Sequence, residues 1–419
     1  MILNLDMRLL DTAVGRYAED AFKFLERLVE ASSTVGHEND ALTVLGVELE
    51  RLGFAVERLP LEDRLGDDPL AGVPSQSYAG RFDVIGRRGA GPGRSLMFNG
   101  HIDVVPADEP GLWTSDPFIP VRRDGWLWGR GAGDMKAGFA MGTLAIRALD
   151  AVAPNAVAGP LTFLGVIEEE CTGNGTLAAA RAGVLADAVV LLEPTDLNLM
   201  LGGVGILWVD IDVDGFAAHA ESADRAVNPI DVALRLLPAL RDFERELNAD
   251  AGDPVFAHVD QPYNLNIGVI QAGDWPSSVP SIARLRLRLG YPRRWSPDEA
   301  ERRVREVVAA AGGRDDWLAS HPARVRCSGF RAEGYCLSSS DPLVGALSQA
   351  HADAHGERPS TFSLGSTTDA RYYVNNFDRP ALCYGPVARD IHGVDERVEL
   401  DSIVRGAKTL VRFLASWWP

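Results

Sequence analysis

Two hydrophobic patterns alternate along the first half of the chain. In one, apolar residues recur every three or four positions, which is typical of amphipathic helices; in the other, short runs are apolar throughout, which is typical of buried strands. The first pattern predicts helices over 18–31, 39–52 and 139–152, and the second predicts strands that include 96–98, 161–167 and 188–192. Helices that alternate with such strands indicate an α/β domain with a mostly parallel sheet.

The pattern changes beyond Gly203. Residues 206–216 alternate between apolar and polar positions, and the next elements are predicted as helix, strand, strand, helix and strand, over 229–247, 264–273, 281–291, 297–311 and 323–330. This order, β-α-β-β-α-β, is typical of a small two-layer α+β sandwich of the ferredoxin-like type. Helical spacing returns at 341–355 and 402–417. We therefore expect a main domain formed by 1–203 and 333–419, with 204–332 inserted into it.

Length and charge narrow the functional classes. The chain has 419 residues, which exceeds the roughly 250–300 at which a single core stops growing. Its 59 acidic and 41 basic residues give a formal charge of −18, which argues against nucleic acid or an anionic membrane as a partner. No apolar run is long enough to span a bilayer, and no basic-then-apolar leader begins the chain, so we expect a cytoplasmic protein.

The four cysteines predict no disulfide framework and no cysteine-based zinc site. Their spacing shows no CxxC pair, and four thiols in a chain of this length are sparse, so reduced side chains are the expectation. Any metal site in this protein should therefore use oxygen and imidazole ligands.

His101 and Asp103 follow the first of the apolar strands, in the stretch SLMFNGHIDVVP. In extended backbone, a spacing of two residues places both side chains on the same side. Neutral imidazole is a good zinc ligand, and a nearby carboxylate commonly orients such a histidine. Taken alone, a histidine at a strand end is more often a hydrogen-bonded structural residue.

Four further stretches place acidic or histidine side chains at or just after strand ends. They contain Asp134, the run Glu168 to Glu170, Glu193 and His392. Asp134 alone would be a helix N-cap, and the glutamates alone would be a solvated turn. Carboxylates gathered at the ends of strands as apolar as LTFLGVI and AVVLL repel one another unless positive charge is nearby. The simplest explanation is a dinuclear metal centre.

These motifs resemble those of a family of metallopeptidases and deacylases that includes acetylornithine deacetylase, succinyl-diaminopimelate desuccinylase, aminoacylase and carboxypeptidase G. The resemblance runs from SSTVGHEND to HGVDERV and rests on GHIDVVP, GRGAGDMKAG, EEECTGNGT and EPT. It implies two zinc ions, with cobalt or manganese as alternatives, bridged by Asp134. His101 and Glu193 would complete one site, and Glu170 and His392 the other.

The triple glutamate leaves the register of the general base open. Aligned on the family motif, Glu169 is the general base and Glu170 the metal ligand; a slip of one residue would make Glu168 the base and Glu169 the ligand. The spacing to Gly175 favours the first alignment. The resemblance also implies that Asp103 orients His101 and that the peptide bond between Asp134 and Met135 is cis.

Substrate contacts are also implied by the resemblance. His219, in GFAAHAESADRAVNPI, is the candidate oxyanion donor from the inserted domain, contributed by a partner subunit of a homodimer, and Asn228 is a second contact candidate. Arg371, in GSTTDARYY, would bind a substrate carboxylate. The alternatives are a surface histidine at position 219 and an Arg371 paired with Asp369.

One position departs from the family pattern. Many members carry an arginine before the aromatic-Pro pair that ends a strand of the inserted domain, and this chain reads LRLGYP with Gly290 there. A polar contact to the substrate is therefore either missing or supplied by Arg286 or Arg288.

The function that the resemblance implies is a two-metal amidohydrolase that removes an acyl group from a small amino-acid-like substrate. Glu193 in the EPT motif favours the deacylases over the carboxypeptidases. The alternatives are a carboxypeptidase or dipeptidase, an N-formyl amide hydrolase, and a non-catalytic binding protein that keeps the fold. The sequence leaves the acyl group, the amine, the native metal and the oligomeric state open.

Overall fold

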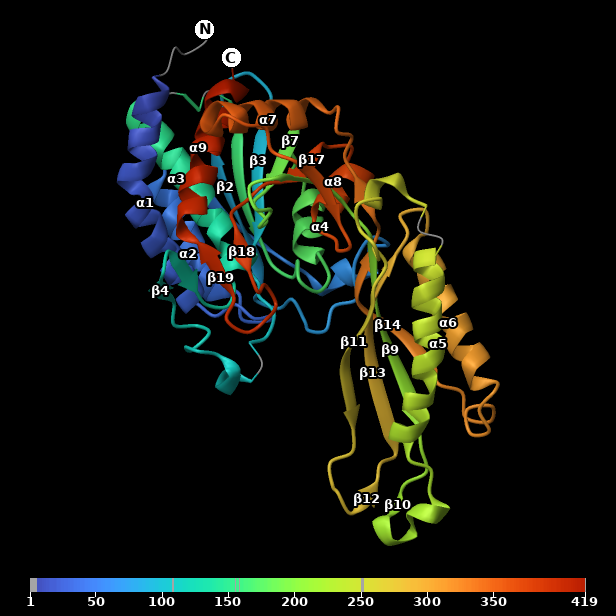
Figure 1. The fold of residues 1–419 in the computed structure, drawn as a ribbon. Coiled ribbons are helices and arrows are strands. Elements are labelled where there is room, and N and C mark those ends of the chain that lie inside the picture. Colours follow the sequence, from blue (N-terminus) through green and yellow to red (C-terminus); the bar gives the residue numbers. More distant parts are fainter. Residues whose placement is uncertain (1–5, 108, 155, 158, 250–251, 419) are drawn as a thin grey trace.

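The computed structural model describes residues 6–107, 109–154, 156–157, 159–249 and 252–418. It has two parts: a larger unit built on a nine-stranded sheet, and an elongated two-layer unit that extends away from it (Figure 1). The larger unit contains the first and the last described helices, and the two-layer unit is formed by residues between β8 (Leu199–Gly203) and β15 (Tyr335–Cys336).

The large sheet has the order β1-β2-β6-β3-β7-β17-β8-β15, with β16 paired to β8. Its central strands β6, β3, β7 and β17 run parallel, and antiparallel pairs flank them on both sides. The strands are β1 (Ala55–Pro60), β2 (Phe82–Arg88), β3 (Leu96–His101), β6 (Leu161–Val166), β7 (Ala188–Leu191), β8 (Leu199–Gly203), β15 (Tyr335–Cys336), β16 (Thr361–Leu364) and β17 (Ala381–Cys383). The α/β prediction with a parallel centre is confirmed.

Helices cover both faces of this sheet, which explains the continuous apolar runs of its strands. Phe98 of β3 packs into the core formed with the long helices, whereas its neighbour Met97 belongs to the core on the opposite face. The first face carries α1 (Met7–Glu30), α2 (Asn39–Arg51), α3 (Ala137–Val152), α7 (Pro342–His355) and α9 (Leu400–Trp417); the second carries α4 (Asn174–Arg181) and α8 (Ala370–Asn376).

The two-layer unit is an antiparallel sheet of order β11-β13-β9-β14 with two helices on one face. Its strands are β9 (Gly205–Asp214), β11 (Leu265–Ala272), β13 (Ile282–Tyr291) and β14 (Arg324–Ala332), and its helices are α5 (Pro229–Ala249) and α6 (Pro297–Gly312). A small hairpin of β10 (Ala218–His219) and β12 (Ser278–Val279) lies at its far end (Figure 1). The predicted element order is observed, and the domain boundaries stay a prediction.

Smaller elements complete the larger unit. A second sheet has the order β18-β19-β5-β4, formed by β4 (Val121–Arg123), β5 (Trp126–Trp128), β18 (Ala388–Arg389) and β19 (Arg397–Glu399). Short helical turns occur at η1 (Asp63–Asp67), η2 (Pro110–Leu112), η3 (Ala132–Lys136), η4 (Ala220–Arg225) and η5 (Pro254–Phe256). The peptide bond Asp134–Met135 is cis, as predicted.

Two helices were not predicted, and one is longer than predicted. The short helices α4 and α8 are absent from the sequence prediction, and α1 begins at Met7 rather than near residue 18. All four cysteines are free thiols. Across the described ranges, no helix combines the length and apolarity that crossing a membrane requires.

Candidate metal centre

Three neighbouring parallel strands deliver side chains to one edge of the large sheet. His101 is the last residue of β3, Glu168 to Glu170 follow β6, and Glu193 follows β7. Parallel strands all end on the same side of a sheet, so His101, the three glutamates and Glu193 come together although they are far apart in the sequence. Asp134 arrives from η3, just before α3, and His392 from the loop between β18 and β19.

The first group of potential ligands consists of His101, Asp134 and Glu193, whose ligand atoms all lie within 4.8 Å of one another. His101 Nε2 is 3.2 Å from Asp134 Oδ1 and 3.7 Å from Glu193 Oε2. The imidazole and the Glu193 side chain are buried, so this group lies below the protein surface, at the carboxyl ends of the strands.

The second group consists of Asp134, Glu170 and His392, again within 4.8 Å. His392 Nε2 is 3.0 Å from Glu170 Oε1 and 3.4 Å from Asp134 Oδ2. Asp134 thus turns one oxygen toward His101 and the other toward His392. This arrangement suits a carboxylate that bridges two cations.

Negative charge dominates the site. Burial raises the pKa of Glu193 to about 7 and that of Glu169 well above its ordinary value. Burial opposes a charged His101, but Glu193, Asp134 and Glu169 together outweigh it and raise the pKa of that imidazole. Glu170 likewise raises the pKa of His392 to about 11. Without bound cations, the negative charge of the cluster is therefore balanced by protons, which the carboxylates hold or draw onto the two histidines.

The donor set fits two divalent cations. Imidazole nitrogen and carboxylate oxygen suit zinc, and carboxylate-rich sites also accept manganese. Glu193 Oε1 is buried and has no hydrogen-bond partner among the described residues, which is costly unless a cation takes its lone pairs. His101, Asp134 and Glu193 could hold one ion, and Asp134, Glu170 and His392 the other.

The three consecutive glutamates have different surroundings. Glu168 is fully buried, and its carboxylate accepts hydrogen bonds from Arg81 Nη1 at 2.6 Å, Tyr78 Oη at 2.6 Å and Thr172 Oγ1 at 2.7 Å. Glu169 instead lines a cleft between the larger unit and the two-layer unit, and its Oε2 is 4.0 Å from His101 Nε2. The geometry favours Glu169 as the base, because the carboxylate of Glu168 is already bonded elsewhere.

Asp103 supports the site in a way that the sequence did not predict. Its carboxylate accepts the backbone N–H groups of Glu169 and Glu170, both at 3.1 Å, and lies 3.7 Å from His101 Nδ1. The backbone carbonyl of Asp103, at 2.9 Å, accepts from His101 Nδ1 when that nitrogen carries the proton. The residue therefore contacts His101 through its main chain and the two glutamates through its side chain. Burial raises the pKa of this carboxyl group to about 8.

A buried ion pair that the sequence analysis missed connects two of these segments, the one that contains Asp134 and the one that contains His392. Arg130 Nη1 contacts Glu396 Oε2 at 2.5 Å, and both side chains are at most 3% exposed. Glu396 Oε1 accepts the backbone N–H groups of Gly133 and Asp134, at 2.9 and 3.0 Å. Arg130 also donates to the carbonyl of Gly393, beside His392. The only sequence signal was that Glu396 belongs to the HGVDE stretch.

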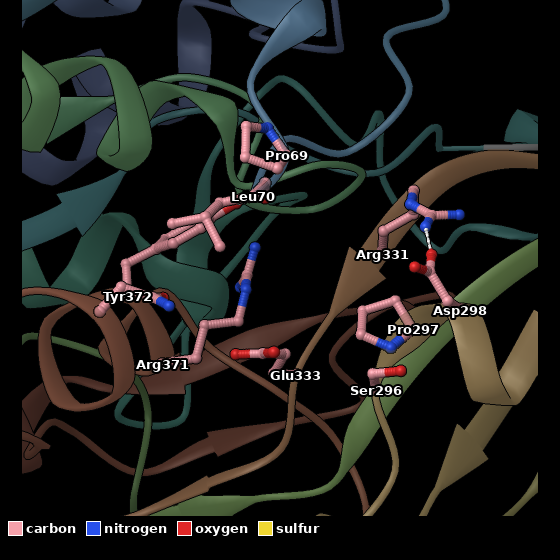
Figure 2. A pocket seen from close by; sticks show the side chains of 10 residues that line it. Pro69, Leu70, Ser296, Pro297, Asp298, Arg331, Glu333, Arg371 and Tyr372 are labelled. Carbon is pink, nitrogen blue, oxygen red and sulfur yellow. Dashed lines mark hydrogen bonds and ion pairs between the residues drawn. The ribbon is translucent and has the colours of Figure 1, made fainter.

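Arg371 is neither in the two groups of candidate ligands nor among the described residues that line the cleft at Glu169. Its side chain is 3% exposed, and Nη1 is 3.2 Å from Asp369 Oδ1, while Nη2 donates to the carbonyl of Thr172 at 3.0 Å. Figure 2 shows it beside Tyr372 and near Glu333, in a pocket of about 170 Å³ whose described lining includes none of the candidate metal residues. The geometry favours the Asp369 pairing over the carboxylate role.

His219 and Asn228 lie in the two-layer unit. His219 is exposed in β10, at the end far from the larger unit (Figure 1), and its Nδ1 accepts the N–H of Glu221. Asn228 Oδ1 accepts the N–H of Ile230 at the start of α5. Neither is among the described residues that line the cleft at the candidate metal centre of the same chain.

The cleft between the two units has a volume of about 430 Å³, within the range of small-molecule sites. Glu169, Glu170 and His392 line its floor on the larger unit, and Trp208, Arg288 and Phe330 face it from the sheet of the two-layer unit. A ligand held here would lie between the candidate metal residues and that sheet.

Fold and site together define an α/β protein with a candidate centre for two metal ions. The chain belongs to peptidase family M20/M25/M40, whose family model matches residues 97–416, and is thus a metal-dependent hydrolase that acts on amide bonds. The resemblance drawn from the motifs is thereby confirmed.

A relative in sequence agrees with this assignment, and two solved structures share the fold. The chain is 33% identical over 403 residues to a succinyl-diaminopimelate desuccinylase of Methylobacterium sp. (strain 4-46), covering 94% of each chain. Among solved structures it resembles the di-peptidase Dug1p from Saccharomyces cerevisiae, with a TM-score of 0.80, 15% identity and 98% of both chains covered. It also resembles human carnosine dipeptidase 1, with a TM-score of 0.77, 16% identity and coverage of 98% and 99%.

Proposed function

We propose that this protein is a dizinc N-deacylase that hydrolyses the acyl amide of a small N-acyl amino acid. One observation carries the proposal: two groups of three ligands share Asp134, and Glu169 lies beside them at the cleft. A relative of 33% identity that is named as a desuccinylase supports the deacylase reaction. Cobalt or manganese are the alternatives to zinc.

The chain's residues have distinct parts in this reaction. Two bound divalent ions would supply Lewis-acid activation of water and of the amide carbonyl. Glu169 takes the proton of the attacking water and returns it to the leaving amine. Its raised pKa, caused by burial, suits a group that must accept and then donate a proton near neutral pH. Asp103 holds the backbone of Glu169 and Glu170 while this happens.

Hydrolysis of a matched substrate panel tests the reaction. The metal-loaded protein should hydrolyse one class among N-acetyl, N-succinyl and N-formyl amino acids. Glu169→Gln should lose at least about a thousandfold in kcat while it keeps its metal content, because it removes the base and leaves the ligands. Activity retained by Glu169→Gln would overturn the assigned base, and no turnover by the wild type would overturn the deacylase.

A dipeptidase or carboxypeptidase is the second candidate. The solved structures that this fold resembles include two dipeptidases. Dipeptides therefore belong in the same panel, and a kcat/KM for dipeptides above that for every N-acyl amino acid would select this alternative. A preference for N-formyl substrates would instead indicate an N-formyl amide hydrolase.

The oxyanion donor is proposed to come from a second copy of the chain. His219 lies at the far end of the two-layer unit, which supports a role outside its own cleft. The edge strand β11 exposes Val269 and Ile270, and such an edge can pair with another copy.

Mixing two inactive variants tests this homodimer. In a mixture of His219→Ala and Glu169→Gln, each mixed dimer holds one complete site, so activity should return to about a quarter of the wild-type value at equal amounts. Sedimentation should show a dimer. Activity that does not rise above the two variants measured separately would contradict a donor acting in trans.

A further inference from the structure

The face of the two-layer sheet opposite its helices carries a ladder of ion pairs. On β9, Asp210 and Asp212 lie two positions apart and share this face. The neighbouring strand β13 places an arginine across from each: Arg286 pairs in register with Asp210, and Arg284 with Asp212. The atoms are close, with Arg284 Nε 2.8 Å from Asp212 Oδ1 and Arg286 Nε 3.6 Å from Asp210 Oδ1. Cross-strand pairs of opposite charge are a normal way to stabilise such a face.

The ladder breaks at its next step. Arg288 continues the arginine series on β13, but the residue across from it on β9 is Trp208. Among the described residues, Arg288 has no carboxylate partner, and Nη2 donates to the carbonyl oxygen of Gly365 at 3.0 Å. Partial burial lowers the pKa of Arg288, and no acidic neighbour offsets this effect. A half-buried guanidinium without an anion is an incomplete arrangement.

Arg288 lies on the wall of the cleft that contains the candidate metal centre. The lining includes Arg288 together with Glu169, Glu170 and His392. On its other side, Arg288 pairs in register with Asn266 of the edge strand, whose amide also lines the cleft. An anion bound in the cleft could therefore pair with the guanidinium of Arg288, which has no carboxylate partner in the ladder.

Beside Arg288 the wall of the cleft carries two aromatic rings. The rings of Trp208 and Phe330 meet edge to face, with centroids 5.5 Å apart, and both line the cleft. Val73 from the larger unit and Val269 from β11 also border this space. Such a surface favours an apolar or aromatic group over a second charged one.

We propose that Arg288 binds the carboxylate of the substrate and that the Trp208–Phe330 wall contacts an apolar side chain, so that the substrates are N-acyl derivatives of apolar or aromatic amino acids. This inference rests on the proposed deacylase. It assigns the carboxylate contact to Arg288, which has no carboxylate partner in the ladder, rather than to Arg286, which also lines the cleft but lies 3.6 Å from Asp210.

Binding to a catalytically inactive protein tests this specificity apart from the reaction. Zinc-loaded Glu169→Gln is titrated calorimetrically with N-acetyl-L-phenylalanine, N-acetyl-L-phenylalaninamide and N-acetylglycine. The acid should bind about 10–100 times more tightly than the amide, since it alone gives Arg288 a charged partner. It should also bind at least about tenfold more tightly than N-acetylglycine, which leaves the aromatic wall uncovered.

Substitution of the arginines shows which of them causes the preference for the acid over the amide. Arg288→Met, added to Glu169→Gln, should abolish the preference for acid over amide, and Arg288→Lys should restore part of it. Arg284→Met is the matched control, because this residue lies on the same strand and face but pairs with Asp212. The control should keep the full preference.

Each outcome decides the inference. Equal binding of acid and amide, a preference that survives Arg288→Met, tighter binding of N-acetylglycine, or no binding of any probe would overturn it. Failure of the deacylase proposal is visible separately, because wild-type protein would then bind N-acetyl-L-phenylalanine without hydrolysing it or any other N-acyl amino acid.

Discussion

The buried pair of Arg130 and Glu396 should decide whether the Asp134 loop keeps its shape. In Glu396→Gln the side chain keeps its size, and one oxygen can still accept the N–H groups of Gly133 and Asp134. The charge that faces Arg130 is lost, however, and that guanidinium is only 3% exposed. Breaking a buried pair from one side costs about 3–5 kcal/mol, a large part of the roughly 5–15 kcal/mol that stabilises a typical domain.

Two measurements follow from this reasoning. Guanidinium denaturation of the metal-free protein should show the loss of about 3–5 kcal/mol in the free energy of unfolding, without the stabilisation that bound ions add. Competition with a chelating dye should show a 10–100-fold loss in zinc affinity, which is usual when a group that supports a metal ligand is removed.

An exposed ion pair supplies the control. Asp401 and Arg405 lie 3.0 Å apart on α9, with side chains 71% and 39% exposed, so Asp401→Asn should cost less than about 1 kcal/mol. If Glu396→Gln costs no more than this control, the reasoning is refuted. Adding Arg130→Met to Glu396→Gln should cost less than the sum of the two single changes, since the second change removes an already unpaired charge.

The remaining predictions concern the metals, the pH and the packing. Removal of metal with a chelator should abolish hydrolysis and lower the melting temperature, and added zinc should restore both, because the ions bind the native state. Burial lowers the pKa of His351 to about 4, so the unfolded chain, with a histidine pKa of about 6.5, takes up the proton first as the pH falls. Stability should therefore decrease from about pH 6.5 to pH 4, and His351→Gln should flatten that part of a melting-temperature profile. Gly138→Ala should cost about 1–3 kcal/mol in denaturant titrations, because its Cβ would overlap the carbonyl oxygen of Leu192, whereas Gly345→Ala, in open space on α7, should gain about 0.5–1 kcal/mol.

The sequence predicted best those site residues that directly follow a strand of the large sheet. The apolar runs before His101, Glu168 and Glu193 identify parallel strands, and parallel strands necessarily bring their last residues to one edge. His392 was also predicted to follow a strand, but that strand is β18 of the second sheet. Its assignment to the same place, nearly two hundred residues later, therefore depended on the family resemblance.

What the sequence did not predict depends on contacts between distant segments. Arg130 and Glu396 are 266 positions apart, and nothing near either residue indicates that both are buried. Helix α1 packs against α3 and α9, and Arg412 of α9 contacts Asp11 in the early turns of α1, which a local periodicity does not reveal. For Arg371 the sequence offered two partners, and only the positions of the carbonyl of Thr172 and of Asp369 favour the structural one.

The place of β17 in the large sheet has a consequence for how the protein is made. This strand, Ala381–Cys383, lies between β7 and β8, whose residues leave the ribosome nearly two hundred positions earlier. Until β17 arrives, these strands expose the edges that it later fills, and the second ligand group lacks His392. The nascent chain therefore has to carry an open sheet edge through the synthesis of the whole two-layer unit. We expect nascent chains that end before residue 381 to need chaperones more than the complete protein does.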